Sequence, residues 1–182
     1  MEKLNSEIRD WESSNIQVFS GEIAPCDHLL HIYQNDLTFL NTLEGFAGDG
    51  FMKGESVVIL ATQEHIDQLD ARLTMHGFDL TDLRVKDQYI AIEAEECLSL
   101  FMVNNWPDEN LFQSFIAEVL SRAQRNNRKT RAFGELVALL WANGHTGATV
   151  HLEILWHRLH SKNNFCLYCA YPQRGFTQYA TA

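Results

Sequence analysis

The stretch TRAFGELVALLWANG, residues 130–144, combines a short strand, a Gly-Glu pair and an apolar helix. A strand that runs into a helix through so short a turn is typical of sheets in which strands and helices alternate. In such sheets ligands bind beyond the carboxyl ends of the strands, and Glu135 lies at such an end. Its carboxylate can belong to an active site, belong to a sensing pocket, or simply complement the dipole of the helix that follows.

The same alternation continues on both sides of this stretch. The run ESVVILAT, residues 55–62, has the continuous apolar and β-branched character of a strand buried on both faces. Helical patterns separate it from four further expected strands, over residues 28–34, 88–94, 129–135 and 165–172. The sequence therefore predicts an α/β fold, a three-layer sandwich with a central, mostly parallel sheet of about five strands.

Composition limits the classes of partner. The chain has 182 residues, 46% of them hydrophobic, and a formal net charge of -10 from 14 Lys and Arg against 24 Asp and Glu. An acidic surface disfavours nucleic acid and anionic membranes. No apolar run reaches the ~18–20 residues that span a bilayer, and the polar N-terminus is unlike a secretory signal. We therefore expect a cytoplasmic protein with no direct nucleic-acid or membrane partner.

A polar segment precedes the α/β pattern. Its apolar residues Leu4, Ile8 and Trp11 recur at helical spacing. Residues 1–20 are therefore expected to form an N-terminal helical extension, followed by a single domain over residues 21–182. Such an extension would pack on the domain, pair with a second chain or follow an upstream domain, so a homodimer stays open.

The first expected turn from strand to helix, IYQNDLTF at residues 32–39, is unlike a phosphate-binding loop. It lacks the glycines that expose backbone N–H groups to phosphate and the lysine that neutralises the charge. Asp36 in this turn would repel a triphosphate. Because GxGxxG and GxSxG motifs are also absent from the chain, we expect a protein that is not an enzyme and holds no cofactor.

Two patterns suggest metal or redox chemistry only weakly. Cys166 and Cys169 form a Cys-x-x-Cys, but residues i and i+3 of a strand point to opposite faces, so we expect buried and inert thiols. Glu153, His157 and His160 fall on one flank of an expected helix. A metal-dependent enzyme built on this flank is one alternative, and a solvated Glu–His pair is the other.

Aromatic side chains near the carboxyl ends of the strands suit a small apolar or aromatic ligand. The candidate ligand-binding residues are Tyr33, Thr62, Glu135, Trp141, Trp156 and Tyr171. Glu135 is expected to orient the ligand, and the others to line the pocket. The alternative is that the rings are core residues and that Glu135 only complements a helix dipole.

Several segments occur in an order that resembles the MEDS family, a sensory domain of methanogen and methylotroph regulators. They are HLLHIYQNDLTFLNTLEGFAGDGFMKGESVVILAT (28–62), RAFGELVALLWANG (131–144), LEILW (152–156) and FCLYCAYP (165–172). The likeness runs from about residue 26 to residue 176. It implies a degenerate, RecA- and KaiC-like fold without a functional Walker A loop, in agreement with the turn at residues 32–39.

The resemblance also implies a role in signal transduction and transcription regulation, as a sensor of small, hydrocarbon-derived molecules. The positions that match the family's motifs are His28, Tyr33, Gly54, Glu55, Thr62, Gly134, Glu135, Trp141, Glu153, Trp156, Cys169, Tyr171 and Pro172. The family offers no catalytic residue to transfer. The family commonly has Asn where this chain has His157, so a metal site on this flank would not be a feature of the family.

The resulting hypothesis is a non-enzymatic sensor that binds a small ligand above the strand ends and signals through a partner, such as a kinase or a regulator. Two alternatives stay open. One is a ligand-free adaptor in a two-component or anti-sigma type of pathway. The other is a remnant nucleotide-binding protein that still holds a mononucleotide.

Overall fold

The computed structural model describes residues 28–173, and the expected N-terminal extension over residues 1–20 lies outside them. A five-stranded sheet forms the middle layer, in the order β1-β7-β6-β2-β3, and all its pairings are parallel. The strands are β1 (His28–Tyr33), β2 (Ser56–Ala61), β3 (Tyr89–Glu93), β6 (Thr130–Gly134) and β7 (Cys166–Pro172). A separate antiparallel pair joins β4 (Met102–Val103) to β5 (Trp106–Pro107).

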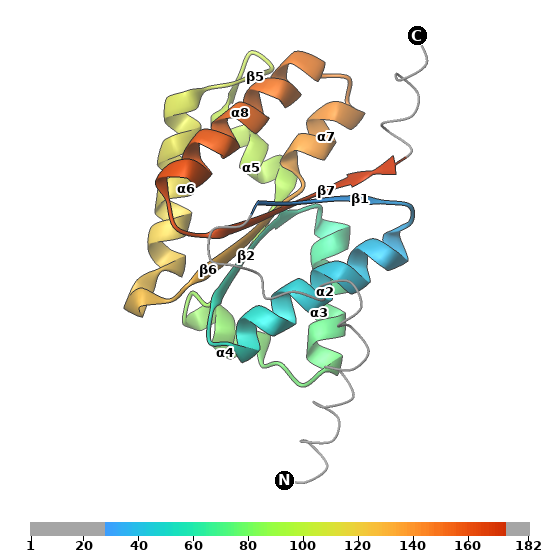
Figure 1. Cartoon of the computed structure of the whole chain (residues 1–182), viewed down its shortest axis with the longest axis vertical. Helices are drawn as coiled ribbons and strands as arrows, with labels where there is room; N and C mark the ends of the chain where they lie inside the picture. Colours follow the sequence, from blue (N-terminus) through green and yellow to red (C-terminus); the bar gives the residue numbers. More distant parts are fainter. Residues whose placement is uncertain (1–27, 174–182) are drawn as a thin grey trace, which may run out of the picture.

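Helices cover both faces of the sheet, as Figure 1 shows. One face carries α2 (Asp36–Met52), α3 (Gln63–Met75) and α4 (Leu80–Val85). The other carries α5 (Ala94–Phe101), α6 (Glu109–Ala123), α7 (Leu136–Ala142) and α8 (Thr146–Lys162), with a 3-10 turn at Arg125–Asn127. Each face has its own apolar core, so the predicted three-layer α/β sandwich is confirmed. The short helix α4 was not predicted.

Local chemistry sets where the helices begin. Five helices start after a side chain that accepts the backbone N–H three residues further on, which satisfies one free donor of the first turn. These caps are Asn35, Thr62, Asp79, Glu93 and Asp108. Several of them directly follow strands, so the turns from strand to helix are short and the strand ends are held firmly.

Side-chain alternation along the strands follows the predicted pattern. Cys166 packs into the core under α2 and α3, whereas Cys169 packs into the core under α5 to α8. His31 lies 2.9 Å from the hydroxyl of Tyr168 on the α2 face, and His28 contacts His160 of α8 on the other face. The two sulfurs of the Cys-x-x-Cys therefore lie on opposite sides of the sheet, as expected.

The chain leaves two neighbouring strands, β2 and β6, in opposite directions. After β2 it continues into α3 on one face and reaches β3; after β6 it continues into α7 on the other face and reaches β7. Such a topological switch point is where open α/β sheets bind their ligands, outside the carboxyl ends of the strands. Thr62 and Glu135 are the first residues beyond these two ends.

Candidate functional site

A buried carboxylate joins the ends of β2 and β6 at the switch point. Glu135 exposes only 6% of its surface, and its Oε2 accepts the backbone N–H of Thr62 at 3.0 Å. Nδ1 of His65, in the first turn of α3, lies 2.8 Å from Oε1 and 3.0 Å from Oε2. The N-terminus of a helix favours negative charge, so Glu135 lies where other α/β proteins bind an anionic ligand.

The backbone of Glu135 hydrogen-bonds within the sheet, and its side chain contacts the first turn of α3. Its N–H donates to the carbonyl of Leu60 at 2.9 Å, which extends the ladder between β6 and β2. The side chain makes no capping hydrogen bond with α7, the helix that it precedes. The contact with the start of α3 is therefore a tertiary one, between residues 73 positions apart.

Three aromatic rings connect the end of β1 to this ion pair. The ring of Tyr33 stacks on Phe39 of α2 with centroids 4.8 Å apart, and Phe39 lies at the same distance from the ring of His65. Burial, with the nearby negative charges of Glu135 and Asp36, raises the pKa of Tyr33 to about 12. The phenol of Tyr33 therefore stays protonated further into the alkaline range than that of an exposed tyrosine.

Opposed effects set the charge of His65. Burial lowers its pKa, but the hydrogen bond to Glu135 and the negative charge of that carboxylate raise it, with smaller contributions from Asp36 and Glu64. The net result is a pKa above the ordinary value of 6.5. His65 therefore keeps its proton into a higher pH range than a free histidine, and the pair with Glu135 is an ionic one while that proton is held.

The structure brings together three of the six predicted ligand-binding residues, namely Tyr33, Thr62 and Glu135. Trp156 and Tyr171 belong to the core on the opposite face of the sheet. Strand register explains the position of Tyr171. It lies opposite Ile32, and because successive residues of a strand face opposite sides, Tyr171 and Tyr33 point to opposite faces of the sheet.

The two tryptophans of the predicted set lie over that opposite face. Trp156 is only 2% exposed and meets the ring of Phe112 edge-on, with centroids 5.1 Å apart. Trp141 lies half-buried on α7. Trp156 is therefore a core residue, which is the alternative that the sequence left open for these rings.

Sequence reasoning missed two members of the cluster, Phe39 and His65. Both lie in the first turns of helices that follow strands, and their rings point back toward the strand ends. His65 had a local signal, since it lies three residues after the capping residue Thr62 and three residues into a helix at the switch point. Nothing in the sequence indicated its partner, because Glu135 is distant along the chain.

Glu153, His157 and His160 formed the alternative metal flank of the sequence analysis. Within residues 28–173, no three His, Cys, Asp or Glu side chains come together closely enough to hold a metal ion. The ring of His160 packs 5.7 Å from that of His28 and edge-on to Phe165. Helical spacing predicted one flank for Glu153, His157 and His160, and the contacts of His160 in the structure are with aromatic rings.

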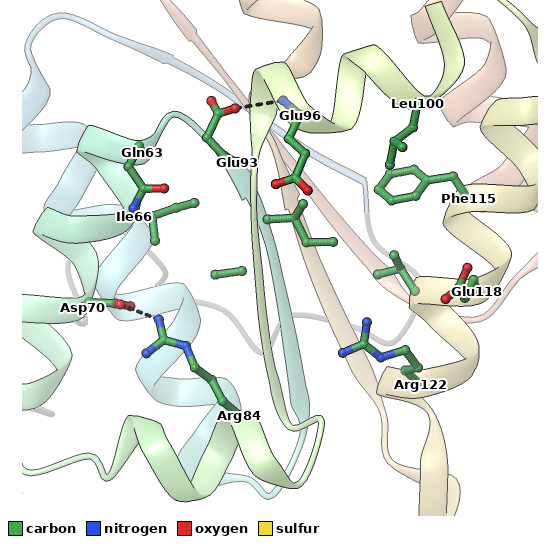
Figure 2. Close-up of a pocket in the computed structure, with 13 residues that line it drawn as sticks. Gln63, Ile66, Asp70, Arg84, Glu93, Glu96, Leu100, Phe115, Glu118 and Arg122 are labelled. Carbon is green, nitrogen blue, oxygen red and sulfur yellow. Dashed lines mark hydrogen bonds and ion pairs between the residues drawn. The ribbon is translucent and has the colours of Figure 1, made fainter.

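A second feature is a hollow of about 550 Å³ along the free edge of β3 (Figure 2). Ala91, Ile92 and Glu93 of β3 form its floor, between the helices of the two outer layers. None of the six predicted ligand-binding residues lines it. Glu93, at the end of β3, accepts the N–H of Glu96 at 2.8 Å and so caps α5.

These features define an open parallel α/β domain with a switch-point site in which a carboxylate of the chain itself occupies the start of a helix. None of the helices among the described residues is long and apolar enough to cross a membrane. The chain belongs to the MEDS family, whose model, described as methanogen/methylotroph, DcmR sensory domain, matches residues 27–182. No curated protein and no solved structure matches the chain. The resemblance to a sensory domain family is thereby confirmed.

Proposed function

We propose that this protein is a signal-transduction sensor that binds a small, hydrocarbon-derived ligand at the switch point and signals through a partner protein. The observation that carries the proposal is the buried contact between Glu135 and the start of α3. Membership of a sensory domain family supports the same role. The ligand has a polar group for Glu135 and His65 and an apolar part for the rings of Tyr33 and Phe39.

The proposed signal is a change in how α3 is held. Glu135 ties the first turn of α3 to the end of β6, while Ile66, Leu69 and Leu73 pack the rest of that helix against the sheet. A polar ligand group that hydrogen-bonds to Glu135 and His65 competes with the N–H of Thr62 for the carboxylate of Glu135. Because a ligand shifts an equilibrium only by binding one conformation better, this exchange has to be coupled to the position of α3.

We infer further that the domain is a RecA-like relative that has lost nucleotide hydrolysis. The side chain of Asn35 accepts the N–H of Thr38 at 2.9 Å, so the N-terminus of α2 is capped by the chain itself. At α3 the hydroxyl of Thr62 accepts the N–H of His65, and the carboxylate of Glu135 accepts the N–H of Thr62. Both helix N-termini that follow the strands on this face are thus satisfied internally, which supports a recognition role over phosphate chemistry.

The test is a thermal-shift and calorimetric titration of the whole chain with methanol and methylamine, and separately with ATP and Mg²⁺. At least one of the small compounds is expected to raise the melting temperature, and Glu135→Gln is expected to abolish that shift. Glu93→Gln is the matched control, since Glu93 is also a strand-end carboxylate that accepts a first-turn N–H.

Three outcomes contradict the proposal. They are hydrolysis of ATP by purified protein, no response to any of the small compounds, and equal loss of the response in both variants. A ligand-free adaptor is the second candidate function. The hollow along β3 favours it, because Thr62, His65 and Glu135 do not line that hollow.

A further inference from the structure

The strand β3 lies at one edge of the sheet. Among residues 28–173, β2 is its only neighbour in the sheet, with Val57 opposite Tyr89. The N–H of Val57 donates to the carbonyl of Gln88 at 2.8 Å. Because alternate residues of a parallel ladder direct their backbone groups to alternate sides, the N–H and C=O of Ala91 point away from β2. An edge of this kind is a template for an additional strand.

This edge lies at the floor of a hollow with two walls, as Figure 2 shows. An added strand would direct its side chains alternately to the two helical layers. The wall made by α3 and α4 offers Ile66, and the wall made by α5 and α6 offers Leu100, Phe115 and Val119. Leu100 is half exposed, so apolar surface is available to a bound segment.

Charges in the hollow are unbalanced toward the acidic side. Both of its arginines, Arg84 and Arg122, are paired with aspartates of the chain. Glu96 and Glu118 also line the hollow, and within residues 28–173 neither carboxylate has an ion pair or a side-chain hydrogen bond. The net charge of the chain, -10, has the same sign. The free charge that faces a bound segment is therefore negative.

We propose that the edge of β3 binds an extended, basic segment of the partner protein, which pairs with Ala91 as a further strand and places Lys or Arg beside Glu96 and Glu118. This proposal deepens the proposed function, on which it rests for its role in signalling. A second copy of the chain fits the site poorly, because two such edges would bring like charges together. Backbone pairing supplies affinity, and alternate side chains supply specificity.

The probe is a capped peptide of alternating valine and lysine, titrated calorimetrically into the whole chain without any small ligand. We expect binding, weakened about fivefold or more by Glu96→Lys and by Glu118→Lys. Glu95→Lys is the matched control, since Glu95 lies in the same first turn of α5 but does not line the hollow. It is expected to change the affinity by less than about twofold.

Two further arms test strand addition and charge. Two N-methylated peptides are compared, one methylated at the odd positions and one at the even positions. Each lacks the N–H donors of one edge of its strand, so one peptide is expected to lose binding while the other keeps it. The double variant Glu96→Lys, Glu118→Lys is expected to bind an alternating valine–glutamate peptide in place of the valine–lysine one. Circular dichroism of each variant checks that it is folded.

The proposal is overturned if the valine–lysine peptide does not bind, or if Glu95→Lys weakens it as much as Glu96→Lys does. Equal binding of the two N-methylated peptides would also overturn it. A dimer in sedimentation that the charge reversals dissociate would assign the edge to a second copy instead. Failure here leaves the thermal response to small compounds unaffected, so the two proposals fail separately.

Discussion

The carboxylate of Glu135, just beyond β6, accepts the backbone N–H of Thr62, just beyond β2, at 3.0 Å. These two residues flank the topological switch point of the sheet. One hydrogen bond therefore ties the ends of two central strands together and satisfies a free donor at the start of α3. The stability of the domain and its proposed response to a ligand both depend on this contact.

Removing the Glu135 side chain is expected to be costly. Glu135→Ala leaves the N–H of Thr62 and the ring of His65 without their partner, and should lower the free energy of unfolding by about 3 kcal/mol. Glu135→Gln keeps an acceptor for Thr62 and should cost about 1 kcal/mol. Urea unfolding measures both. Equal losses in the two variants would show that the hydrogen bond to Thr62 contributes little.

Stability should depend on the proton of His65. Its folded pKa is raised above 6.5, so the stabilisation is fully present below the unfolded pKa and is lost as pH rises through the folded value. His28 and His31 have lowered pKa values, mainly through burial, and contribute with the opposite sign. The pH dependence of the difference between wild type and His65→Gln isolates His65.

The measurement is urea unfolding at a series of pH values from about 5.5 to 8.5. The stability advantage of the wild type over His65→Gln is expected to shrink as pH rises. A difference that stays constant, or grows with pH, would mean that His65 does not hold its proton more tightly in the folded state.

A buried arginine joins β6 to the turn that precedes β2. Arg131 is 3% exposed, its Nε donates to Glu55, and its Nη2 lies 2.6 Å from Oδ2 of Asp49. Arg131→Ala removes the ion-pair partner of Glu55 and leaves Asp49 with Lys53 alone, and it should cost about 3 kcal/mol. Arg125 is the control, because it pairs with Asp87 at an exposed position and its loss should cost below about 1 kcal/mol.

The thiols of the described residues should be unreactive in the native protein. Cys97, Cys166 and Cys169 are buried, and burial is the main effect that raises the pKa of Cys97 to about 12. In a Cys26→Ser background, Ellman's reagent should modify these thiols only as the protein unfolds in urea. Fast labelling under native conditions would contradict the buried environment and reopen a redox role for the Cys-x-x-Cys.

Much of the architecture follows from local pattern. The continuous apolar run of β2 predicted a strand covered on both faces, and all six of its residues are buried. Alternation of strands and helices led to the parallel three-layer sandwich, and strand periodicity placed Cys166 and Cys169 on opposite faces. The sequence also predicted that Tyr33, Thr62 and Glu135 lie at the ends of β1, β2 and β6, where the structure has them.

Strand order and side-chain partners required the tertiary structure. Local periodicity says which residues are buried, but it carries no information about which strand lies beside which, so the switch point between β2 and β6 was not predictable. The same is true of His65 as the partner of Glu135, and of Trp156 and Tyr171 on the opposite face. The edge position of β3, beside Glu96 of α5 and Glu118 of α6, likewise depends on strand order. These features arise from contacts between residues far apart in the chain, whose geometry is determined only when the whole sheet is assembled.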